Sequence, residues 1–282
     1  MTDVNPFLLV TTIIEYDVVV DTDTIDSDSL NYYIRNTTDE VSEQELNGRV
    51  EMSHSATGFF LNSSKGNYYL VTNKHVVAPD TMQSHIVESP TTLTIKRRQI
   101  IDGNWTGRIY NHEIDISEEG LGWVGHPKNM NVDVAVVPLD FDVSKYANTI
   151  DQGLIKSGAD RDEITDYDVG YDSVVIGYPI GFRDTSTEFP IIRKALISSP
   201  QDMLFNGEPR FLIDAKIHGG MSGSPVFESF PLRITPGEGV SYSPRNPRLL
   251  GVLSDSWYPE EDLQLNSVWN GTLITNIIQS IE

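Results

Sequence analysis

The sequence is organised as ten short runs of β-branched and aromatic residues, separated by residues that favour turns. The runs occupy residues 8–20, 56–62, 68–74, 91–98, 133–139, 172–179, 193–199, 210–217, 224–229 and 249–257. Runs of this length and composition are typical of β-strands. Helical patterns occur in two segments, a single turn at 75–78 and a longer stretch at 267–281. In the longer stretch, helical spacing is followed by Val268, Leu273, Ile274, Ile277 and Ile278.

Many evenly spaced strands with little helix predict an all-β protein of the barrel or sandwich class. Residues 140–171 are rich in Asp and poor in strand signal, so we interpret them as containing the connection between two halves. The expected division is an N-terminal domain at 1–150, a C-terminal domain at 151–266 and a C-terminal helix at 267–282. The acidic, polar segment 22–48 is expected to be a surface excursion from the first domain.

The composition excludes several classes of function. The chain has no cysteine, which rules out disulfides, a thiol nucleophile and thiolate metal sites. Its six histidines lack the H-E-x-x-H spacing of zinc enzymes, and no glycine-rich phosphate loop precedes a helix. We therefore expect neither a metal nor a cofactor.

The charge and hydropathy limit the expected partners and location. The net charge of −21 argues against nucleic acid and anionic membranes as partners, and it suits either a solvated acidic surface or attraction of basic peptides. No apolar run reaches 18 residues, and the apolar stretch at 7–14 lacks the basic flank of a secretory signal. We therefore expect a cytoplasmic protein that does not cross a membrane.

The segment H-G-G-M-S-G-S-P-V at 218–226 is either a plain turn between two strands or the site of a reactive serine. Catalysis by serine needs a hydroxyl, an imidazole base, a carboxylate that orients the imidazole, and backbone N–H groups that stabilise an oxyanion. Ser222 would supply the hydroxyl. Gly220 can adopt a backbone conformation closed to other residues, so its N–H and that of Ser222 are candidate oxyanion donors.

Two further residues fit the remaining roles. His75 follows the apolar run YLVTN and precedes VVAP, where it would either cap the turn or act as a rigid base. Asp133 stands at the start of a buried run, where a carboxylate is costly unless it accepts hydrogen bonds, for example from an imidazole. The order His, Asp, Ser is that of chymotrypsin-like enzymes and differs from the orders in α/β-hydrolases and subtilisin. These positions place the site between the two halves.

Four stretches in order, ATGFFLNSSKGNYYLVTNKHVV, VDVAVVPL, VVIGYPIGF and DAKIHGGMSGSPV with LLGVLSDS, resemble motifs of trypsin/chymotrypsin-like serine peptidases. Within that family they are most similar to the cysteine-free bacterial branch that includes HtrA-type proteases. The resemblance implies two six-stranded antiparallel β-barrels with the site in the cleft between them and a C-terminal α-helix. It also implies that His75 is the general base, Asp133 its orienting carboxylate and Ser222 the nucleophile, with Gly220 and Ser222 donating to the oxyanion. Peptide bonds would be hydrolysed through an acyl-enzyme.

The chain departs from the family pattern at three places. Met221 stands where digestive members carry an Asp that pairs with a newly cut N-terminus, so activation by that ion pair is not expected. Ser224 replaces a common glycine, a mild change. The chain ends soon after the expected helix, so no PDZ domain is expected.

Six residues are the candidates for the specificity pocket of this family. They are Lys216, Ile217, His218, Ser254, Asp255 and Ser256. Because no Asp occupies the position that binds basic side chains in trypsin, a tryptic preference is not expected. Apolar or small residues before the scissile bond are the first choice. His218 would either hydrogen-bond a Glu or Gln side chain of the substrate or only shape the turn.

Two other functions compatible with these residues stay open. The barrel pair could serve as a protein-binding module without catalysis, or the same triad could act in an esterase or acyl transferase, because esters and amides share a tetrahedral intermediate. The expected partners are a protein or peptide substrate and, since such domains are often fused or regulated, a regulatory partner protein or a fused domain.

Overall fold

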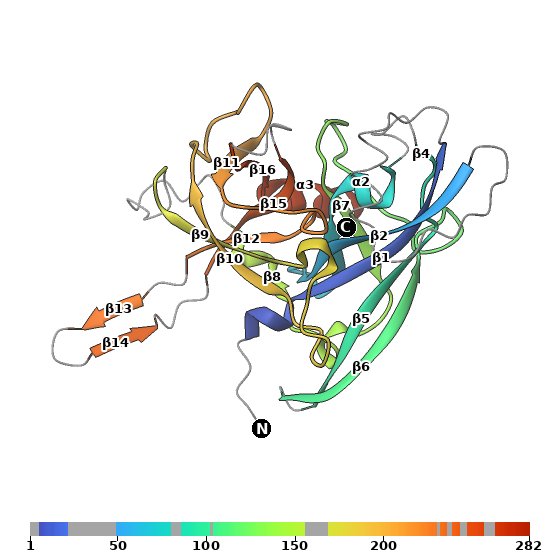
Figure 1. The fold of residues 1–282 in the computed structure, drawn as a ribbon, viewed down its shortest axis with the longest axis horizontal. Coiled ribbons are helices and arrows are strands. Elements are labelled where there is room, and N and C mark those ends of the chain that lie inside the picture. The colour runs from blue at the N-terminus through green and yellow to red at the C-terminus, as the bar shows by residue number, and fades with distance from the viewer. Residues whose placement is uncertain are drawn as a thin grey trace.

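The computed structural model describes residues 6–21, 49–79, 86–101, 104–155, 169–229, 232–235, 239–242, 247–256 and 263–282. The segment 22–48, expected as a surface excursion, lies outside these residues. Strands dominate the described chain, which confirms the all-β prediction. Figure 1 shows two halves side by side, with β1–β7 in one and the strands from β9 onward in the other. Among the described helices, none is long and apolar enough to cross a bilayer.

The first half is a single sheet of eight strands. Its strands are β1 (Thr11–Asp21), β2 (Arg49–Asn62), β3 (Tyr68–Thr72), β4 (Ile86–Glu88), β5 (Thr92–Ile101), β6 (Asn104–Asp115), β7 (Ala135–Leu139) and β8 (Ile150–Asp151). Six of them run in the order β6-β5-β1-β2-β3-β7, while β4 pairs with β1 and β8 pairs with β2. A short helix, α2 (Lys74–Val77), follows β3. The strand β6 was absent from the prediction, because its sequence NWTGRIYNHEID is largely polar.

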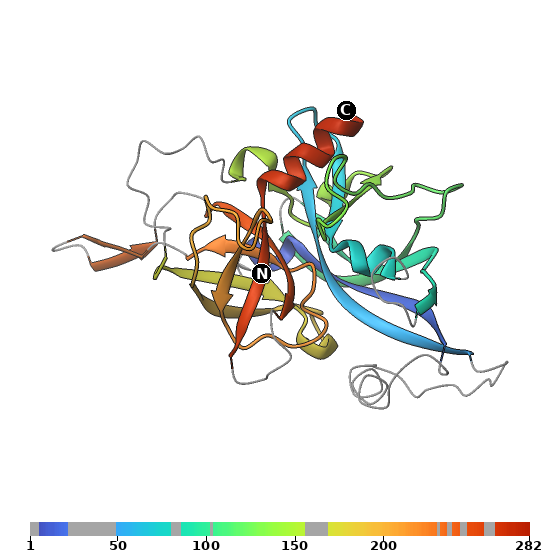
Figure 2. The ribbon, with the colours of Figure 1, turned by 90° about the horizontal axis from the view of Figure 1, so that it is seen from above.

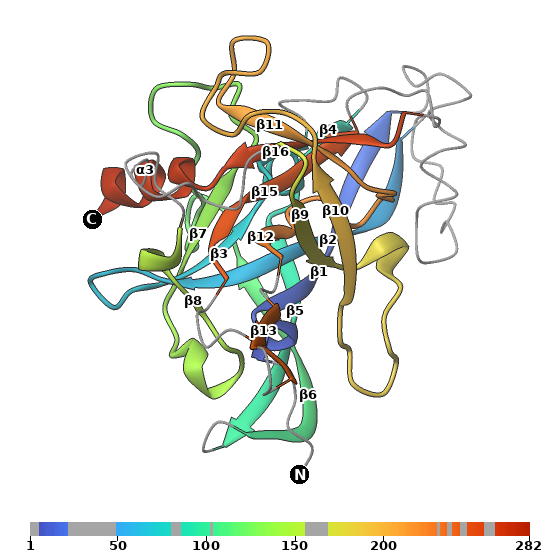
Figure 3. The same ribbon diagram turned by 90° about the vertical axis from the view of Figure 1, so that its left-hand side faces the viewer.

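The second half contains a closed six-stranded barrel, as the family resemblance implies. Its strands are β9 (Asp172–Gly177), β10 (Ile191–Ile197), β11 (Arg210–Asp214), β12 (Pro225–Glu228), β15 (Leu249–Ser256) and β16 (Leu265–Asn270). They close in the order β10-β11-β16-β15-β12-β9. Figure 3, viewed from the side of this half, shows the barrel strands in front of β1 and β2. The strands β13 (Leu232–Thr235) and β14 (Gly239–Tyr242) pair only with each other and project from the barrel in Figure 1.

The C-terminal helix α3 spans Thr272–Ile281, so it begins five residues later than the predicted start at 267. The residues before it form β16, which lies between β11 and β15. Both faces of β16 are buried, so Val268 and Trp269 are both in the core and the strand lacks the alternation that distinguishes it from a helix. Figure 2 shows α3 lying across the junction of the two halves.

One continuous hydrophobic cluster joins the halves and the helix. It combines Phe59 and Val136 of the first sheet with Ile176 and Phe227 of the barrel, and it includes four buried residues of α3. Those four are Leu273, Ile274, Ile277 and Ile278. Burial of apolar surface on both sides of the junction holds the halves in a fixed relation, which is what a site assembled from both of them requires.

Candidate active site

His75 is the second residue of α2, directly after β3 and Asn73. The strand delivers the residue to the junction because β3 is buried from Tyr69 to Thr72. The side-chain amide of Asn73 donates to the carbonyl oxygen of Asp133 at 2.7 Å, which ties this turn to the segment before β7. The side chain of His75 is 12% exposed, so its ring is packed yet still reaches the surface.

Asp133 is buried and accepts three hydrogen bonds. Its Oδ1 accepts from the His75 backbone N–H at 2.9 Å, and its Oδ2 lies 2.8 Å from His75 Nδ1. The hydroxyl of Ser254 donates to the same Oδ2 at 2.6 Å. Burial alone would raise the pKa of Asp133, but the charge of His75 and these hydrogen bonds outweigh it and hold the pKa below its ordinary value. The carboxylate is therefore charged at neutral pH and fixes the ring of His75.

The protonation of His75 follows from this contact. A carboxylate can only accept a hydrogen bond, so Nδ1 of the ring carries the proton that points to Asp133. In the neutral ring the other nitrogen, Nε2, then carries the free lone pair, which can take a proton from a nearby group. The arrangement therefore suits a general base.

Ser222 lies in a turn whose shape depends on two glycines. Gly220 has a φ of +82° and Gly223 a φ of +83°, values that side chains disfavour. A Cβ on Gly220 would lie 2.5 Å from the carbonyl oxygen of Tyr178, and one on Gly223 would lie 2.1 Å from that of Thr57. The turn is thus pressed against both halves of the molecule, with Ser222 itself half-buried at its tip.

Backbone hydrogen bonds tie the Ser222 turn to β2 of the first half and to β15 of the barrel. The N–H of Thr57, on β2, donates to the carbonyl oxygen of Ser222 at 2.9 Å. The N–H of Gly223 donates at 2.9 Å to Leu253, whose neighbour Ser254 holds Asp133. The Ser222 turn therefore contacts both halves of the molecule.

The backbone N–H groups of the two predicted oxyanion donors are available for a hydrogen bond. Within the described part of the chain, the N–H groups of Gly220 and Ser222 have no hydrogen-bond acceptor. Met221 between them is fully buried in the core of the barrel, next to Phe211 and Val226. The residue before the serine therefore contributes apolar packing.

The six candidates for the specificity pocket lie in two segments. Lys216 is exposed, Ile217 packs on the barrel core and His218 is partly buried. Burial lowers the pKa of His218, and the positive charges of Arg193 and Lys216 lower it further. A neutral ring with two cations nearby is thus favoured at neutral pH.

The second segment consists of Ser254, Asp255 and Ser256, which were expected to line the specificity pocket. Ser254 is buried, and its hydroxyl is bonded to Asp133, so the hydroxyl orients the carboxylate. Asp255 and Ser256 continue β15, but their side chains lie outside the described part of the structure.

Sequence analysis missed two threonines that shape the site, Thr57 and Thr72. Thr57 donates through its hydroxyl to the carbonyl oxygen of Gly220 at 2.8 Å and accepts from the N–H of Tyr178 at 3.1 Å. Thr72 donates to the carbonyl oxygen of Thr57 at 2.9 Å. Both threonines stand in strand runs, where threonine is common, so nothing local marks them as part of a site.

Comparisons with known proteins bear on the family and the fold. The family described as trypsin-like peptidase domain matches residues 56–229. A search of curated proteins finds no match. Among solved structures, the HtrA-type protease AlgW with a decapeptide is similar at 15% identity and a TM-score of 0.50, with 97% of this chain and 64% of that chain covered. The thermostable serine protease AL20 from an extremophilic microorganism is similar at 10% identity and a TM-score of 0.50, with 98% of both chains covered. At these identities the likeness shows the fold.

Proposed function

The chain belongs to the trypsin-like peptidase family, and from that premise we propose that it is a serine endopeptidase with His75, Asp133 and Ser222 as its catalytic residues. The observation that carries the proposal is the double contact of Asp133 with His75, through the backbone N–H at 2.9 Å and through Nδ1 at 2.8 Å. A histidine that merely caps a turn does not need a buried carboxylate bonded to its ring. Such a contact is what an imidazole base requires.

The proposed reaction proceeds in two halves. The Oγ of Ser222 attacks the carbonyl carbon of the scissile peptide while its proton passes to Nε2 of His75. The imidazolium, stabilised by Asp133, then gives that proton to the leaving amine, and an ester to Ser222 remains. Water attacks the ester with Nε2 as the base again, which releases the new carboxylate and restores the hydroxyl.

The negative charge that develops on the substrate oxygen needs fixed donors. The N–H groups of Gly220 and Ser222 are suited to this because no other group in the described chain takes their hydrogen bonds. Backbone donors of this kind act without reorganisation, and removal of one typically lowers kcat by about 100- to 1000-fold.

The test is covalent labelling by a fluorophosphonate, which reacts only with an activated serine. Native protein should be labelled at Ser222, and the Ser222→Ala variant should not. Absence of labelling in well-folded protein, across several probe side chains, would instead favour a protein-binding module. Parallel turnover of peptide and ester libraries separates a peptidase from an esterase or acyl transferase.

Charge at the pocket supports a preference against basic side chains. Lys216 occupies the position where trypsin has an Asp, and Arg193 adds a second cation near His218. Coulomb repulsion disfavours a substrate Lys or Arg there. In a peptide series with Ala, Leu, Glu and Lys before the scissile bond, Lys should be cleaved most slowly. The Arg193→Gln variant should reduce the difference between Glu and Lys, and an unchanged difference would contradict this assignment.

A further inference from the structure

A buried arginine joins the two halves of the molecule close to the candidate active site. Arg98, on β5, is 1% exposed, and among the described residues its guanidinium donates to neutral acceptors. These are the carbonyl oxygens of Thr11 at 3.0 Å, Thr187 at 3.3 Å and Glu188, and the hydroxyl of Tyr178 at 2.7 Å. We call Arg98 with these four partners the Arg98 latch. Burial of a charge costs free energy, and the hydrogen bonds to these acceptors compensate for the water that the guanidinium loses.

The latch acts on the loop 178–190, which connects β9 to β10. Tyr178, Thr187 and Glu188 belong to this loop, whereas Arg98 and Thr11 belong to the first half. Glu188 has a φ of +54°, a conformation that costs free energy for a residue with a side chain. Bonds from Arg98 to the carbonyl oxygens of Thr187 and Glu188 hold the loop in this conformation.

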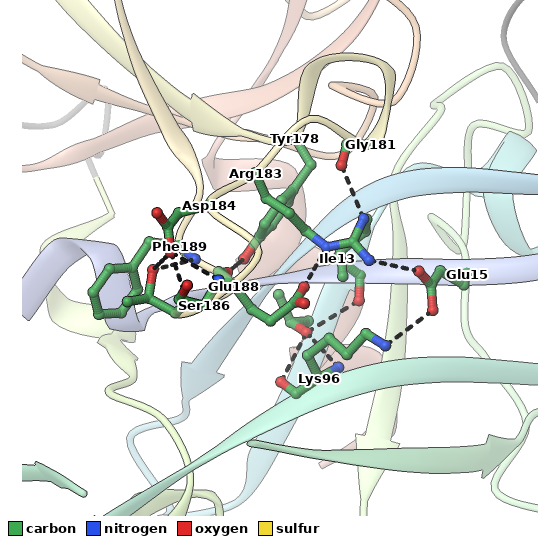
Figure 4. A network of polar contacts seen from close by, with 12 residues as sticks. Ile13, Glu15, Lys96, Tyr178, Gly181, Arg183, Asp184, Ser186, Glu188 and Phe189 are labelled. Carbon is green, nitrogen blue, oxygen red and sulfur yellow. Dashed lines mark hydrogen bonds and ion pairs between the residues drawn. The ribbon is translucent and has the colours of Figure 1, made fainter. Parts of the chain in front are cut away.

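A row of alternating charges reinforces the same loop, as Figure 4 shows. The carboxylate of Glu188 pairs with Arg183, which contacts Glu15 on β1 at 3.3 Å. Glu15 in turn lies 3.4 Å from Nζ of Lys96 on β5. The loop is therefore fastened to the first half at two levels, by the buried latch and by this more exposed row.

Tyr178 connects the latch to the turn that carries Ser222. Its hydroxyl accepts from Arg98, and its N–H donates to the hydroxyl of Thr57, which donates to the carbonyl oxygen of Gly220. Two residues farther along the loop, the N–H of Ile180 donates to the carbonyl oxygen of Gly219 at 2.6 Å. The carbonyl group of Gly219 is thus held by the loop itself, and that of Gly220 is held by the hydroxyl of Thr57, which Tyr178 orients.

This arrangement fixes the direction of the Gly220 N–H. In a trans peptide the C=O and the N–H point in opposite directions. When the loop holds the carbonyl of Gly219 on one side, the N–H of Gly220 must point to the other side, away from the loop. Two adjacent glycines have wide conformational freedom, so an external tie is needed to keep this orientation.

We propose that the Arg98 latch is a positioning device that holds the oxyanion donor of Gly220 ready for the reaction. The inference rests on the proposed peptidase function. In this chain Met221 is apolar and buried, so it cannot receive an ion pair that would order the turn. Instead, Arg98 of the first half orders the turn through Tyr178 and the loop 178–190. Arg98 and Tyr178 are therefore positioning residues, which act through Gly219 and Gly220.

The test compares two Tyr→Phe variants. Tyr178→Phe removes only the hydroxyl that bonds to Arg98. The control is Tyr69→Phe, which removes a hydroxyl bonded to Glu282 at 3.0 Å, outside the latch. A second variant, Arg98→Lys, keeps the charge but cannot reach all four acceptors. The readouts are the rate of fluorophosphonate labelling, kcat and KM, the affinity for a peptide boronate, and Tm.

For Tyr178→Phe, we expect labelling and kcat to fall by about tenfold, a fraction of the loss that follows removal of an oxyanion donor. KM should change by less than about twofold, while boronate affinity falls in step with kcat. Arg98→Lys should have the same signature with a lower Tm, and Tyr69→Phe should keep wild-type kinetics.

Other outcomes decide against the latch or against the function. If wild-type protein is labelled and Tyr178→Phe is labelled equally fast, the latch does not position the donor. If activity falls only in proportion to the folded fraction, with boronate affinity unchanged in folded protein, the latch is structural and the inference is wrong. If wild-type protein is not labelled at all, the proposed function itself fails.

Discussion

Gly220→Ala tests the candidate oxyanion hole most directly, because a second glycine in the chain provides a matched control. Gly220 has a φ of +82°, and Gly66, in the β2–β3 hairpin, has a φ of +85°. An alanine at either position incurs the same backbone strain, about 1–2 kcal/mol. The two sites differ in their surroundings, since a Cβ on Gly66 would meet nothing within 4 Å.

A Cβ on Gly220 would lie 2.5 Å from the carbonyl oxygen of Tyr178 and 3.1 Å from the N–H nitrogens of Ile180 and Gly181. These are backbone atoms, which cannot turn away as the end of a side chain can. The peptide of Gly220 must therefore rotate, and its N–H leaves the direction of the reacting carbonyl. Loss of one such donor costs about 100- to 1000-fold in kcat, or roughly 3–4 kcal/mol of transition-state stabilisation.

The assay combines steady-state hydrolysis of a peptide ester with thermal unfolding of both variants. Gly66→Ala should lose about 2–3 °C in Tm, as expected for strain of this size in a chain of this length, and should keep its activity. Gly220→Ala should lose at least as much stability together with its activity. If Gly220→Ala keeps kcat within about threefold of wild type, Gly220 does not donate to the oxyanion.

Three further predictions concern titration and the hydrogen bond to Asp133. Ser254→Ala should lower kcat by about tenfold, because hydrogen bonds to charged groups contribute about 1.5–3 kcal/mol; an unchanged kcat measured with the same ester would contradict this role. Since the pKa of Asp133 lies below its ordinary value, Asp133 stays charged as the pH falls, and the acidic limb of kcat/KM should have unit slope, as expected for protonation of one catalytic base; activity that stays flat down to about pH 4 would refute it. The pKa of His112 is lowered by burial and then by Arg97, whose Nη1 lies 2.9 Å from His112 Nδ1. The unfolded chain therefore takes up this proton more readily, so the contribution of His112 to stability is complete above pH 6.5 and is lost as the pH falls through its folded value. Wild-type Tm should drop more between pH 7.5 and 5.5 than that of His112→Gln, and equal drops would count against this.

Local patterns in the sequence were enough to predict many of the strands and the glycine-dependent turn at Ser222. Strand runs are visible because a sheet that is buried on one face selects β-branched and aromatic residues over a few consecutive positions. The glycines at 220 and 223 are visible because a positive φ and close backbone contacts leave no room for a side chain. The expectation that a buried carboxylate needs a donor pointed to Asp133, and the structure supplies one in His75.

The tertiary structure alone decided which distant residues complete the site. The start of α3 moved from 267 to 272 because β16 is enclosed by β11 and β15, and enclosure on both faces removes the strand periodicity. The hydroxyl of Ser254 reaches across 121 positions of sequence to Asp133. Arg98, in a polar run of its strand, is buried only because the loop 178–190 folds over it with carbonyl acceptors. A sequence records what each segment prefers by itself, whereas these contacts depend on how the closed barrel and the first sheet meet, and that meeting is fixed only when all of the segments pack together.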